Sequence, residues 1–500
     1  MVPPMRPNRL WRVAAALLAS AAALTLAGGA GPGASAASLP ADPPPPPISW
    51  TACTSPAGYR CGTVDVPVNY AHPSGATISL AVIEKPAADP ASSHGVLLFN
   101  PGGPGESGVQ ILSVLVALLP TTIADDFTLV SFDERGTGAS QGLVCGPSPA
   151  AAASVTPLPS SVGGSLPGAT LYRHLHSQCS AAAPSLLGHI DSTDAARDMD
   201  RIRQALGVSK ISYWGLSYGT VLGAAYAHLF PERVRAMILD GAVVSSAPLV
   251  AGVRSEAAAI TAALDHYFAT CTAEPHCPLG SDPQQTFEHL ETSLASHPLP
   301  APGGGDALPV TVGDLDTAAL FYLSVPSFGS GFTTALVAAE AGNGAPLRSL
   351  SLEFEVDLDN KSLVGPQWAY ACNDTADRMT AEAAGRLAHT LDKHSGPLAA
   401  YAVTYDIAGC VDWPQTPDAI HSVASTAAHS IVVIGNSGDP NTPHTSAVQL
   451  AHDMGGAHLV TWRGWGHTWL LNGSSDACMD QVVNAYLVSG KVPANGTTCE

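Results

Sequence analysis

The chain has 500 residues, of which 46% are hydrophobic and 12% are charged. A chain of this length and composition can bury a large core, and its length allows more than one domain. The formal net charge of −20 argues against nucleic acid and against an anionic membrane surface as partners.

The segment 1–37 has the features of a secretory signal peptide. A basic start with three arginines precedes the apolar run 13–27, which is short for a membrane span. Small residues then offer a cleavage site near Ala36-Ala37, so we expect a secreted protein without a membrane anchor. The proline-rich linker 38–47 separates this segment from the fold.

All ten cysteines follow the signal segment, and in an exported protein this predicts disulfides. Proximity along the chain suggests the pairings Cys53–Cys61, Cys145–Cys179, Cys271–Cys277, Cys372–Cys410 and Cys478–Cys499. The alternative is a metal site at Cys271, His276 and Cys277, but this spacing fits no standard zinc pattern. We therefore predict neither a metal nor another cofactor.

The first part of the fold, residues 48–245, alternates predicted strands with helices. A hairpin comes first, and continuous apolar runs then predict buried parallel strands. The strands are expected over residues 62–68, 78–84, 95–99, 127–132, 210–214 and 234–239. An amphipathic helix is expected over residues 194–206. This alternation predicts a parallel sheet with helices on both faces.

Two loops after the strand 127–132 carry separate expectations. Asp133 and Arg135 begin the first loop, and we expect them to form an ion pair that braces it. The second, residues 146–169, is rich in Ala, Pro, Ser and Gly and is predicted to lack regular structure.

Alanine-rich helical segments replace the alternation over residues 246–424. These helices are expected over 255–268, 283–296, 317–323, 333–341 and 381–391. We interpret the region as a helical cap inserted over the carboxyl edge of the sheet. Strands return at 430–435 and 457–462, so residues 425–500 should complete the core. The fold class is therefore α/β, with a mostly parallel, doubly wound sheet and an inserted, largely helical cap.

The run Gly215-Leu-Ser-Tyr-Gly219 lies between a predicted strand and the predicted helix 221–227. A strand that turns into a helix within so few residues strains the backbone at the serine, and the glycines let strand and helix pass closely. This nucleophile elbow would expose the hydroxyl of Ser217 above the sheet edge, at the N-terminus of a helix. The alternative is a glycine-rich turn with a solvated serine.

A serine hydroxyl becomes nucleophilic when a histidine takes its proton and a buried carboxylate orients that histidine. In the α/β-hydrolase fold the three residues follow the order serine, acid, histidine, on loops after strands. Ser217, Asp439 and His467 satisfy both the order and the placement. Weaker candidates for the acid and the base are Asp240, His228 and His444.

The tetrahedral intermediate of such a reaction needs N–H donors for its oxyanion. Tyr218, directly after the serine, supplies one, and the loop after the strand 95–99 should supply the other. The prolines of that loop have no N–H, which leaves Gly102 or Gly103, and we predict Gly103.

From Trp50 onward, these motifs together resemble those of secreted bacterial α/β-hydrolase exopeptidases of the tripeptidyl-aminopeptidase and prolyl-aminopeptidase kind. The motifs are Asn100-Pro-Gly-Gly-Pro-Gly, Asp133-Glu-Arg-Gly-Thr-Gly, Gly215-Leu-Ser-Tyr-Gly, Gly438-Asp-Pro-Asn-Thr-Pro and Gly466-His467. The C-terminal part most resembles the tripeptidyl-aminopeptidase branch. The resemblance implies that Ser217, Asp439 and His467 release short pieces, above all tripeptides, from peptides with a free N-terminus through an acyl-serine intermediate.

Family members with aminopeptidase activity hold the substrate's α-ammonium group with carboxylates of the cap. The candidates here are Glu106, Glu256, Glu274, Glu353, Glu355, Asp357 and Asp374, and the sequence does not choose among them. The alternative function is that of a secreted carboxylesterase or lipase-like hydrolase with the same triad. The oligomeric state is left open, and a monomer is compatible with the sequence.

Overall fold

A single sheet with the strand order β1-β2-β3-β5-β4-β6-β7-β8-β9-β10 forms the centre of the fold. The computed structural model describes residues 44–245, 248–301, 308–326, 331–356, 362–414, 422–473 and 476–500. The predicted signal segment, most of the linker and Asp357 lie outside the described residues. The strands are β1 (Thr51–Ala52), β2 (Arg60–Pro67), β3 (Thr77–Lys85), β4 (Val96–Asn100), β5 (Thr128–Phe132), β6 (Ile211–Leu216), β7 (Val234–Asp240), β8 (Ile431–Gly438), β9 (His458–Trp465) and β10 (Thr497–Cys499).

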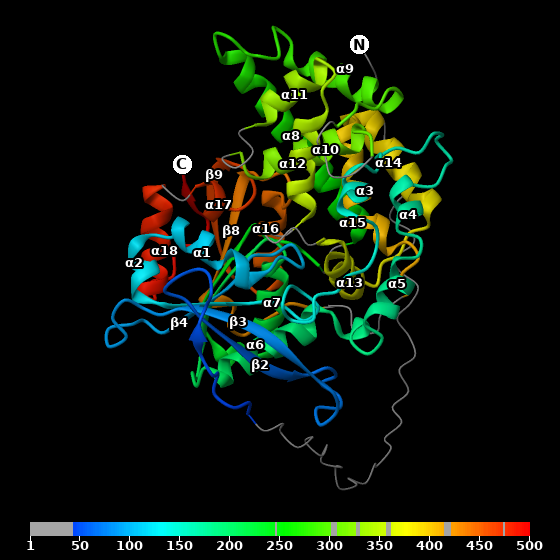
Figure 1. Ribbon diagram of the computed structural model, residues 1–500. Helices are drawn as coiled ribbons and strands as arrows, with labels where there is room; N and C mark the ends of the chain where they lie inside the picture. Colours follow the sequence, from blue (N-terminus) through cyan, green and yellow to red (C-terminus); the bar gives the residue numbers. More distant parts are fainter. Residues whose placement is uncertain are drawn as a thin grey trace, which may run out of the picture. The chain divides into compact units, whose positions relative to one another are not determined.

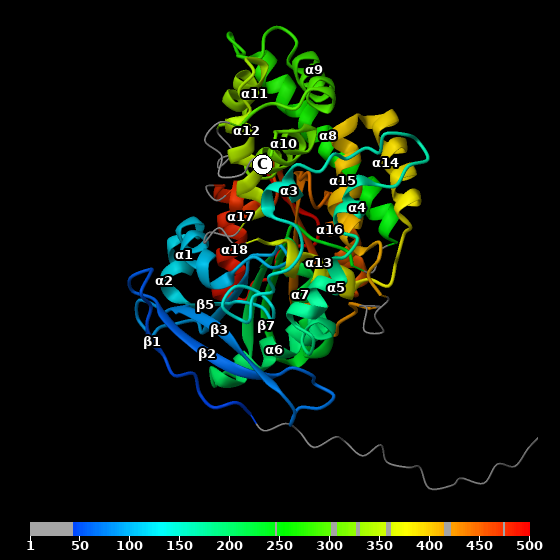
Figure 2. The ribbon, with the colours of Figure 1, turned by 45° about the vertical axis from the view of Figure 1, so that its right-hand side comes forward.

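The N-terminal strands pair antiparallel, and from β5 to β10 every neighbouring pair is parallel. Helices cover both faces of this sheet, as Figures 1 and 2 show. Strand β6 illustrates why: Tyr213 packs into the apolar core on one face and Trp214 into the core on the other. Successive side chains of a strand point to opposite faces, so an apolar strand needs cover on both. The predicted doubly wound α/β fold is thus confirmed.

The described helices outside the long insertion cover the sheet, apart from three short ones between residues 149 and 182, whose main contacts are with the insertion. They are α1 (Gly108–Leu118), α2 (Thr121–Asp126), α3 (Pro149–Ala153), α4 (Pro167–Leu171), α5 (Leu175–Ala182), α6 (Ser192–Ala205), α7 (Gly219–Leu229), α16 (His444–Asp453), α17 (Trp469–Asn472) and α18 (Ala477–Ser489). Short 3-10 turns are η1 (Leu187–His189), η2 (Pro231–Arg233), η3 (Ala408–Cys410) and η4 (Ala428–Ser430).

Between β7 and β8 the described chain is largely helical. The helices are α8 (Leu249–Ala273), α9 (Pro283–Ser296), α10 (Val312–Ser324), α11 (Phe332–Glu340), α12 (Ala345–Glu355), α13 (Val364–Asp374), α14 (Ala381–Ser395) and α15 (Pro397–Ile407). Most of them gather at one end of the sheet, at the top in both views, whereas α13 lies beside α5 (Figures 1 and 2).

The sequence did not predict α12, α13 and α15, and the predicted loop 146–169 contains α3 and the start of α4. Proline explains most of these errors. Helices α3, α4, α12 and α15 each have a proline at their first or second position, where the missing N–H has no intrahelical partner to lose. A proline that looks like a helix breaker therefore marks a helix start.

All five predicted disulfides are confirmed. The Cys271–Cys277 bond rules out the alternative metal site, because its thiolates are consumed. Among the described residues, no helix is both long and apolar enough to cross a membrane.

The expected ion pair between Asp133 and Arg135 was wrong. Arg135 pairs instead with Asp198, at 2.6 Å, and with Asp194, at 3.4 Å, both on α6. The Asp133 carboxylate accepts hydrogen bonds from Ser107 Oγ and from backbone N–H groups at the start of α1 and in its own loop. Spacing in the loop could not reveal these partners, since they come from other elements.

Candidate active site

Ser217 stands at the turn between β6 and α7 with a φ of 53°. A positive φ in a residue other than glycine is strained, and a nucleophile elbow imposes this conformation. The flanking glycines are sterically required. A methyl group added to Gly215 would lie 2.3 Å from Gly219 O, and one added to Gly219 would lie 2.6 Å from Asn100 Oδ1. The local geometry therefore has the features expected of the elbow.

The structure brings the predicted acid and base together. His467 Nδ1 lies 3.0 Å from each carboxylate oxygen of Asp439. The carboxylate is fixed in turn: Oδ1 accepts the N–H groups of Asn441 and Thr442, and Oδ2 accepts Thr442 Oγ1 at 2.8 Å. Asp439 and His467 are both buried. This loop after β8 is built to hold one carboxylate against one imidazole.

Ser217 and His467 flank the dipeptide Asp240-Gly241. The N–H of Ser217 donates to Asp240 O at 2.9 Å, and a methyl group added to Gly241 would lie 3.1 Å from His467 Cε1. The carboxylate of Asp240 points elsewhere and accepts the first two N–H groups of α17, at 2.8 and 3.0 Å. Asp240 thus caps a helix, and it is not the hydrogen-bond partner of the imidazole.

Two opposing effects act on His467. Burial alone would lower the pKa of the imidazole, but the charge and hydrogen bond of Asp439, with a smaller effect of Asp240, raise the pKa above its ordinary value. The other candidate histidines have different partners, because His444 Nε2 contacts Thr461 and His228 Nδ1 contacts Ala424 O.

The loop after β4 lies directly against the elbow. A methyl group added to Gly102 would lie 2.9 Å from Ser217 Cβ and 3.2 Å from Tyr218 N. The N–H of Gly102 already donates to Asn100 Oδ1 at 3.1 Å. Gly103, the next residue, is exposed. The N–H of Gly102 is therefore already engaged, and Gly103 stays the predicted second donor beside Tyr218.

The end of α10 holds the histidine loop. Ser324 O accepts the N–H of His467 at 2.7 Å and Asn472 Nδ2 at 3.0 Å. Ser324 Oγ also contacts Asn441 Oδ1 at 2.6 Å. The helical region therefore contributes directly to the placement of both the acid loop and the histidine loop.

Among the candidate carboxylates, Glu256 on α8 differs from the rest. It is only 6% exposed, it interacts electrostatically with the carboxyl group of Asp406 on α15, and its Oε1 has no hydrogen-bond partner among the described residues. Burial, followed by the negative charges of Asp406 and Asp439, raises the pKa of Glu256 well above its usual range. Burial likewise raises the pKa of Asp406.

Glu106 and Glu355 are half-buried, and burial raises the pKa of Glu355 to about 8. The other three described candidates are less suited to bind a cation. Glu274 and Glu353 are exposed. Asp374 is buried, but it already accepts hydrogen bonds from Ser192 N, Ser192 Oγ and Tyr218 Oη. Asp406 was missed by the sequence analysis. The sequence did indicate that its partner Glu256 is buried, since Glu256 lies within the apolar stripe of α8 formed by Val253, Ala257 and Ile260.

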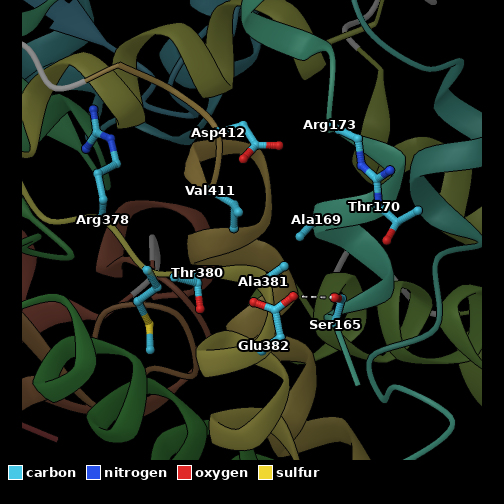
Figure 3. Close-up of a pocket in the computed structure, with 11 residues that line it drawn as sticks. Ser165, Ala169, Thr170, Arg173, Arg378, Thr380, Ala381, Glu382, Val411 and Asp412 are labelled. Atoms are coloured by element: carbon cyan, nitrogen blue, oxygen red, sulfur yellow. Dashed lines mark hydrogen bonds between the residues drawn. The ribbon is translucent and has the colours of Figure 1, made fainter. Parts of the chain in front are cut away.

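Two other features lie apart from these residues. A pocket of about 410 Å³ between α4, the start of α14 and the η3 region is lined by mixed polar and apolar side chains, and none of the predicted site residues is among them (Figure 3).

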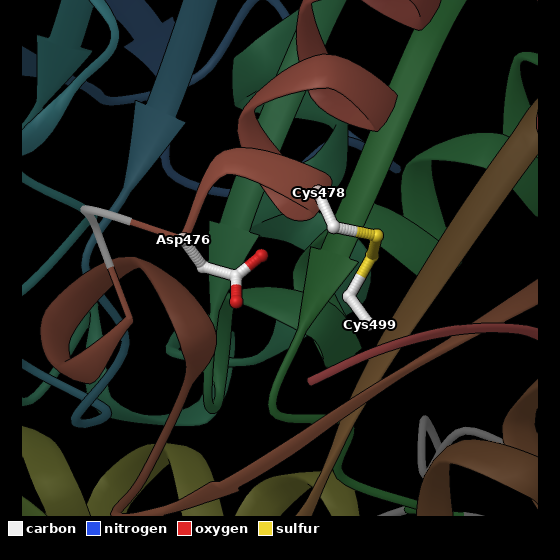
Figure 4. A group of neighbouring side chains, drawn as sticks. All are labelled: Asp476, Cys478 and Cys499. Atoms are coloured by element: carbon white, nitrogen blue, oxygen red, sulfur yellow. A yellow bond between two sulfur atoms is a disulfide. The ribbon is translucent and has the colours of Figure 1, made fainter.

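Asp476, Cys478 and Cys499 lie close together, but the two sulfurs form a disulfide and Asp476 caps α18 (Figure 4). This group therefore has no thiolate for a metal.

Comparison with known proteins places the chain among enzymes. The family described as TAP-like protein matches residues 396–499, which include Asp439 and His467. The chain is 31% identical over 489 residues to serine protease Hip1 of Mycobacterium tuberculosis, covering 90% of this chain and 91% of the relative. It is 32% identical over 456 residues to carboxylesterase B of the same organism, covering 88% and 86%. It is 28% identical over 481 residues to the tripeptidyl aminopeptidase of Streptomyces lividans, covering 90% and 86%.

Proposed function

The chain belongs to the TAP-like family of α/β-hydrolase serine hydrolases, and we propose that it is a secreted aminopeptidase that releases short N-terminal pieces, tripeptides above all, from peptides. The released piece passes through an ester with Ser217. The two curated relatives named as a protease and as a tripeptidyl aminopeptidase support this assignment over most of the chain.

In the proposed reaction Ser217 Oγ attacks the scissile carbonyl carbon while His467 takes its proton. Asp439 orients the imidazole and stabilises its charged form. The N–H groups of Tyr218 and Gly103 hold the oxyanion of the tetrahedral intermediate. His467 then protonates the leaving amine. A water molecule, deprotonated by His467, hydrolyses the acyl-serine and restores Ser217. This chemistry requires no cofactor.

The observation that carries the aminopeptidase assignment is the carboxyl pair formed by the buried Glu256 and the partly buried Asp406. Two carboxyl groups in contact within a protein interior share a proton, because two adjacent negative charges are costly there. A substrate α-ammonium group would supply the positive charge and the N–H donors that the pair lacks. The charge of Asp439 contributes to the raised pKa of Glu256, which supports a location near the triad. We propose that this pair measures the distance from the peptide N-terminus to Ser217.

The test uses chromogenic amides of one, two and three residues, each with a free and with an acetylated N-terminus. The proposal requires cleavage that depends on the free amine and is fastest for one length, expected to be three. Glu256→Gln should lower kcat/KM for the free-amine amides about 10- to 100-fold, since one charged hydrogen bond is weakened. Glu353→Gln, exposed on α12, is the matched control and should leave kcat/KM unchanged.

The second candidate function is ester hydrolysis, because carboxylesterase B is as similar to this chain as Hip1. A short-chain acyl ester in the same assay separates the two functions. Equal turnover of free and acetylated amides, with the ester far faster, would favour the esterase and would leave Glu256→Gln without a selective effect.

We also propose that the signal segment 1–37 is removed on export and that residues 246–424 act as a cap over the core formed by 48–245 and 425–500. The disulfides support an oxidising destination. Sequencing the N-terminus of protein recovered from culture medium tests the export. It should begin near Ala37, and an intact residue 1 would contradict this.

A further inference from the structure

The side chain of Tyr218 connects the elbow to the inserted helical region. Its hydroxyl donates to Asp374 Oδ2, at 3.0 Å, and also contacts Ser192 Oγ. Asp374 is the last residue of α13, within the insertion, and Ser192 begins α6 in the core. All three residues are buried. The residue directly after the nucleophile is therefore tied to the insertion through a buried carboxyl group.

Asp374 is well suited to hold this position. Its Oδ1 accepts the N–H of Ser192 at 2.8 Å, and its Oδ2 accepts Ser192 Oγ at 2.6 Å as well as the tyrosine hydroxyl. A carboxylate can accept three hydrogen bonds at once, and charged acceptors make stronger ones than neutral acceptors. Burial raises the pKa of Tyr218 well above its usual range, so its hydroxyl keeps its proton and acts as the donor.

Helix α13 also contacts the other side of the oxyanion site. A methyl group added to Gly105, in the loop that carries Gly103, would lie 2.8 Å from Pro366 Cγ on α13. Tyr370, one turn before Asp374, donates to Arg135 O at 3.0 Å. One helix of the insertion thus packs on the loop expected to supply one oxyanion donor and anchors the residue expected to supply the other.

We propose that Asp374 is a positioning residue for the oxyanion hole: by anchoring the Tyr218 side chain it fixes the direction of the Tyr218 N–H. The insertion is therefore part of the catalytic apparatus as well as a cover for the substrate. The inference rests on the serine-hydrolase chemistry proposed above, but it does not depend on whether the substrate carries a free amine.

The physical reason is preorganisation. An oxyanion donor acts only when it points at the position that the charged oxygen occupies in the transition state. The hydrogen bond to the ground-state carbonyl oxygen is weaker and depends less on the direction of the N–H group. A less fixed Tyr218 N–H should therefore lower kcat and leave KM nearly unchanged. A general folding defect or a substrate-binding defect would not lower kcat while leaving KM unchanged.

The experiment compares Tyr218→Phe and Asp374→Ala with the wild type. Both variants should lower kcat about 10- to 100-fold. This loss is smaller than the loss on complete removal of an oxyanion donor. KM should change by no more than about twofold. Affinity for a peptide boronic acid, whose adduct places an oxygen in the oxyanion hole, should fall by about the same factor as kcat, while affinity for the product peptide should stay constant.

Tyr226→Phe is the matched control. Tyr226 is a buried tyrosine on the same helix α7, and its hydroxyl donates to the buried carboxylate of Asp200 at 3.3 Å. It lies outside the site, so its loss should leave kcat and boronic acid affinity unchanged. If Asp374→Ala does not fold, Ser192→Ala removes another partner of the Tyr218 hydroxyl and should reduce kcat in the same direction.

A Tyr218→Phe variant with wild-type kcat and boronic acid affinity would overturn the inference, as would a loss confined to KM. These results differ from a failure of the proposed function. Cleavage that ignores N-terminal acetylation would refute the aminopeptidase, yet kcat for an ester would still report on Tyr218 and Asp374.

Discussion

His467 Nδ1 lies at the same distance, 3.0 Å, from both carboxylate oxygens of Asp439. The carboxylate cannot turn away, because Asn441 N, Thr442 N and Thr442 Oγ1 occupy its other acceptor positions. With Nδ1 committed as a donor to the carboxylate, Nε2 is the nitrogen left to act as the base.

The two buried aspartates near the imidazole should respond differently to the same change. Asp439→Asn should lower kcat about 10³- to 10⁴-fold, since an amide can present its NH₂ group to Nδ1 and favour the wrong tautomer. Asp240→Asn should instead cost about 1–3 kcal/mol of unfolding free energy, because the amide NH₂ group would face one of the two N–H groups of α17 that each bond a separate oxygen now. Steady-state kinetics and urea unfolding of both variants check this. The reverse pattern would identify Asp240 as the catalytic acid.

The pH dependence of kcat/KM should report the imidazole. The base must be neutral, and its pKa is raised above the ordinary value of 6.5. Activity should therefore be lost as the pH falls through a midpoint above 6.5. The residual activity of Asp439→Asn should show its midpoint at lower pH, because the charge that raises the pKa is gone. A wild-type midpoint well below 6 would be inconsistent with an Asp439-paired base.

A second buried carboxyl pair should make stability fall at high pH. Glu291 on α9 and Asp316 on α10 are buried, and both oxygens of Asp316 have no donor among the described residues. Burial, with the charges of Glu288 and Asp392, raises the pKa of Glu291 to about 8. Burial, with the charges of Glu291 and Asp314, raises that of Asp316. Because these pKa values lie above those of the unfolded chain, the stabilisation is complete below about pH 4 and is lost as the pH rises through about 8.

The variant Asp316→Asn removes one of these charges. Its unfolding free energy relative to the wild type should therefore rise by about 1–3 kcal/mol between pH 4.5 and pH 8. Glu274→Gln, exposed at the end of α8, is the control and should show no such trend. Thermal unfolding at several pH values measures the difference. Parallel curves for wild type and Asp316→Asn would contradict the prediction.

The parts of the site that the sequence predicted are those encoded locally. The spacing of Gly215, Ser217 and Gly219 is a property of one turn, and the two prolines around Gly102 and Gly103 restrict the donors of one loop. The positions of most strands along the chain similarly follow from short apolar runs that can be recognised without their partners.

The parts that the sequence did not predict depend on packing between distant elements. Glu256 and Asp406 meet only because α8 and α15 pack together, and neither residue identifies the other in the sequence. Asp374 is one of the ammonium ligands that the sequence suggests, whereas the structure gives it Ser192 and Tyr218 as partners. Helix α13 was not predicted because Gly365 and Pro366, near its start, are residues typical of a loop.

The most direct test of the proposed activity is irreversible labelling with tripeptidyl diphenyl phosphonates, one with a free N-terminus and one acetylated. The free compound should inactivate the enzyme at least about tenfold faster, and mass spectrometry should place the adduct on Ser217. Ser217→Ala should remain unlabelled with its fold intact. Equal rates for the two compounds, or an adduct on another residue, would contradict a serine aminopeptidase built on Ser217.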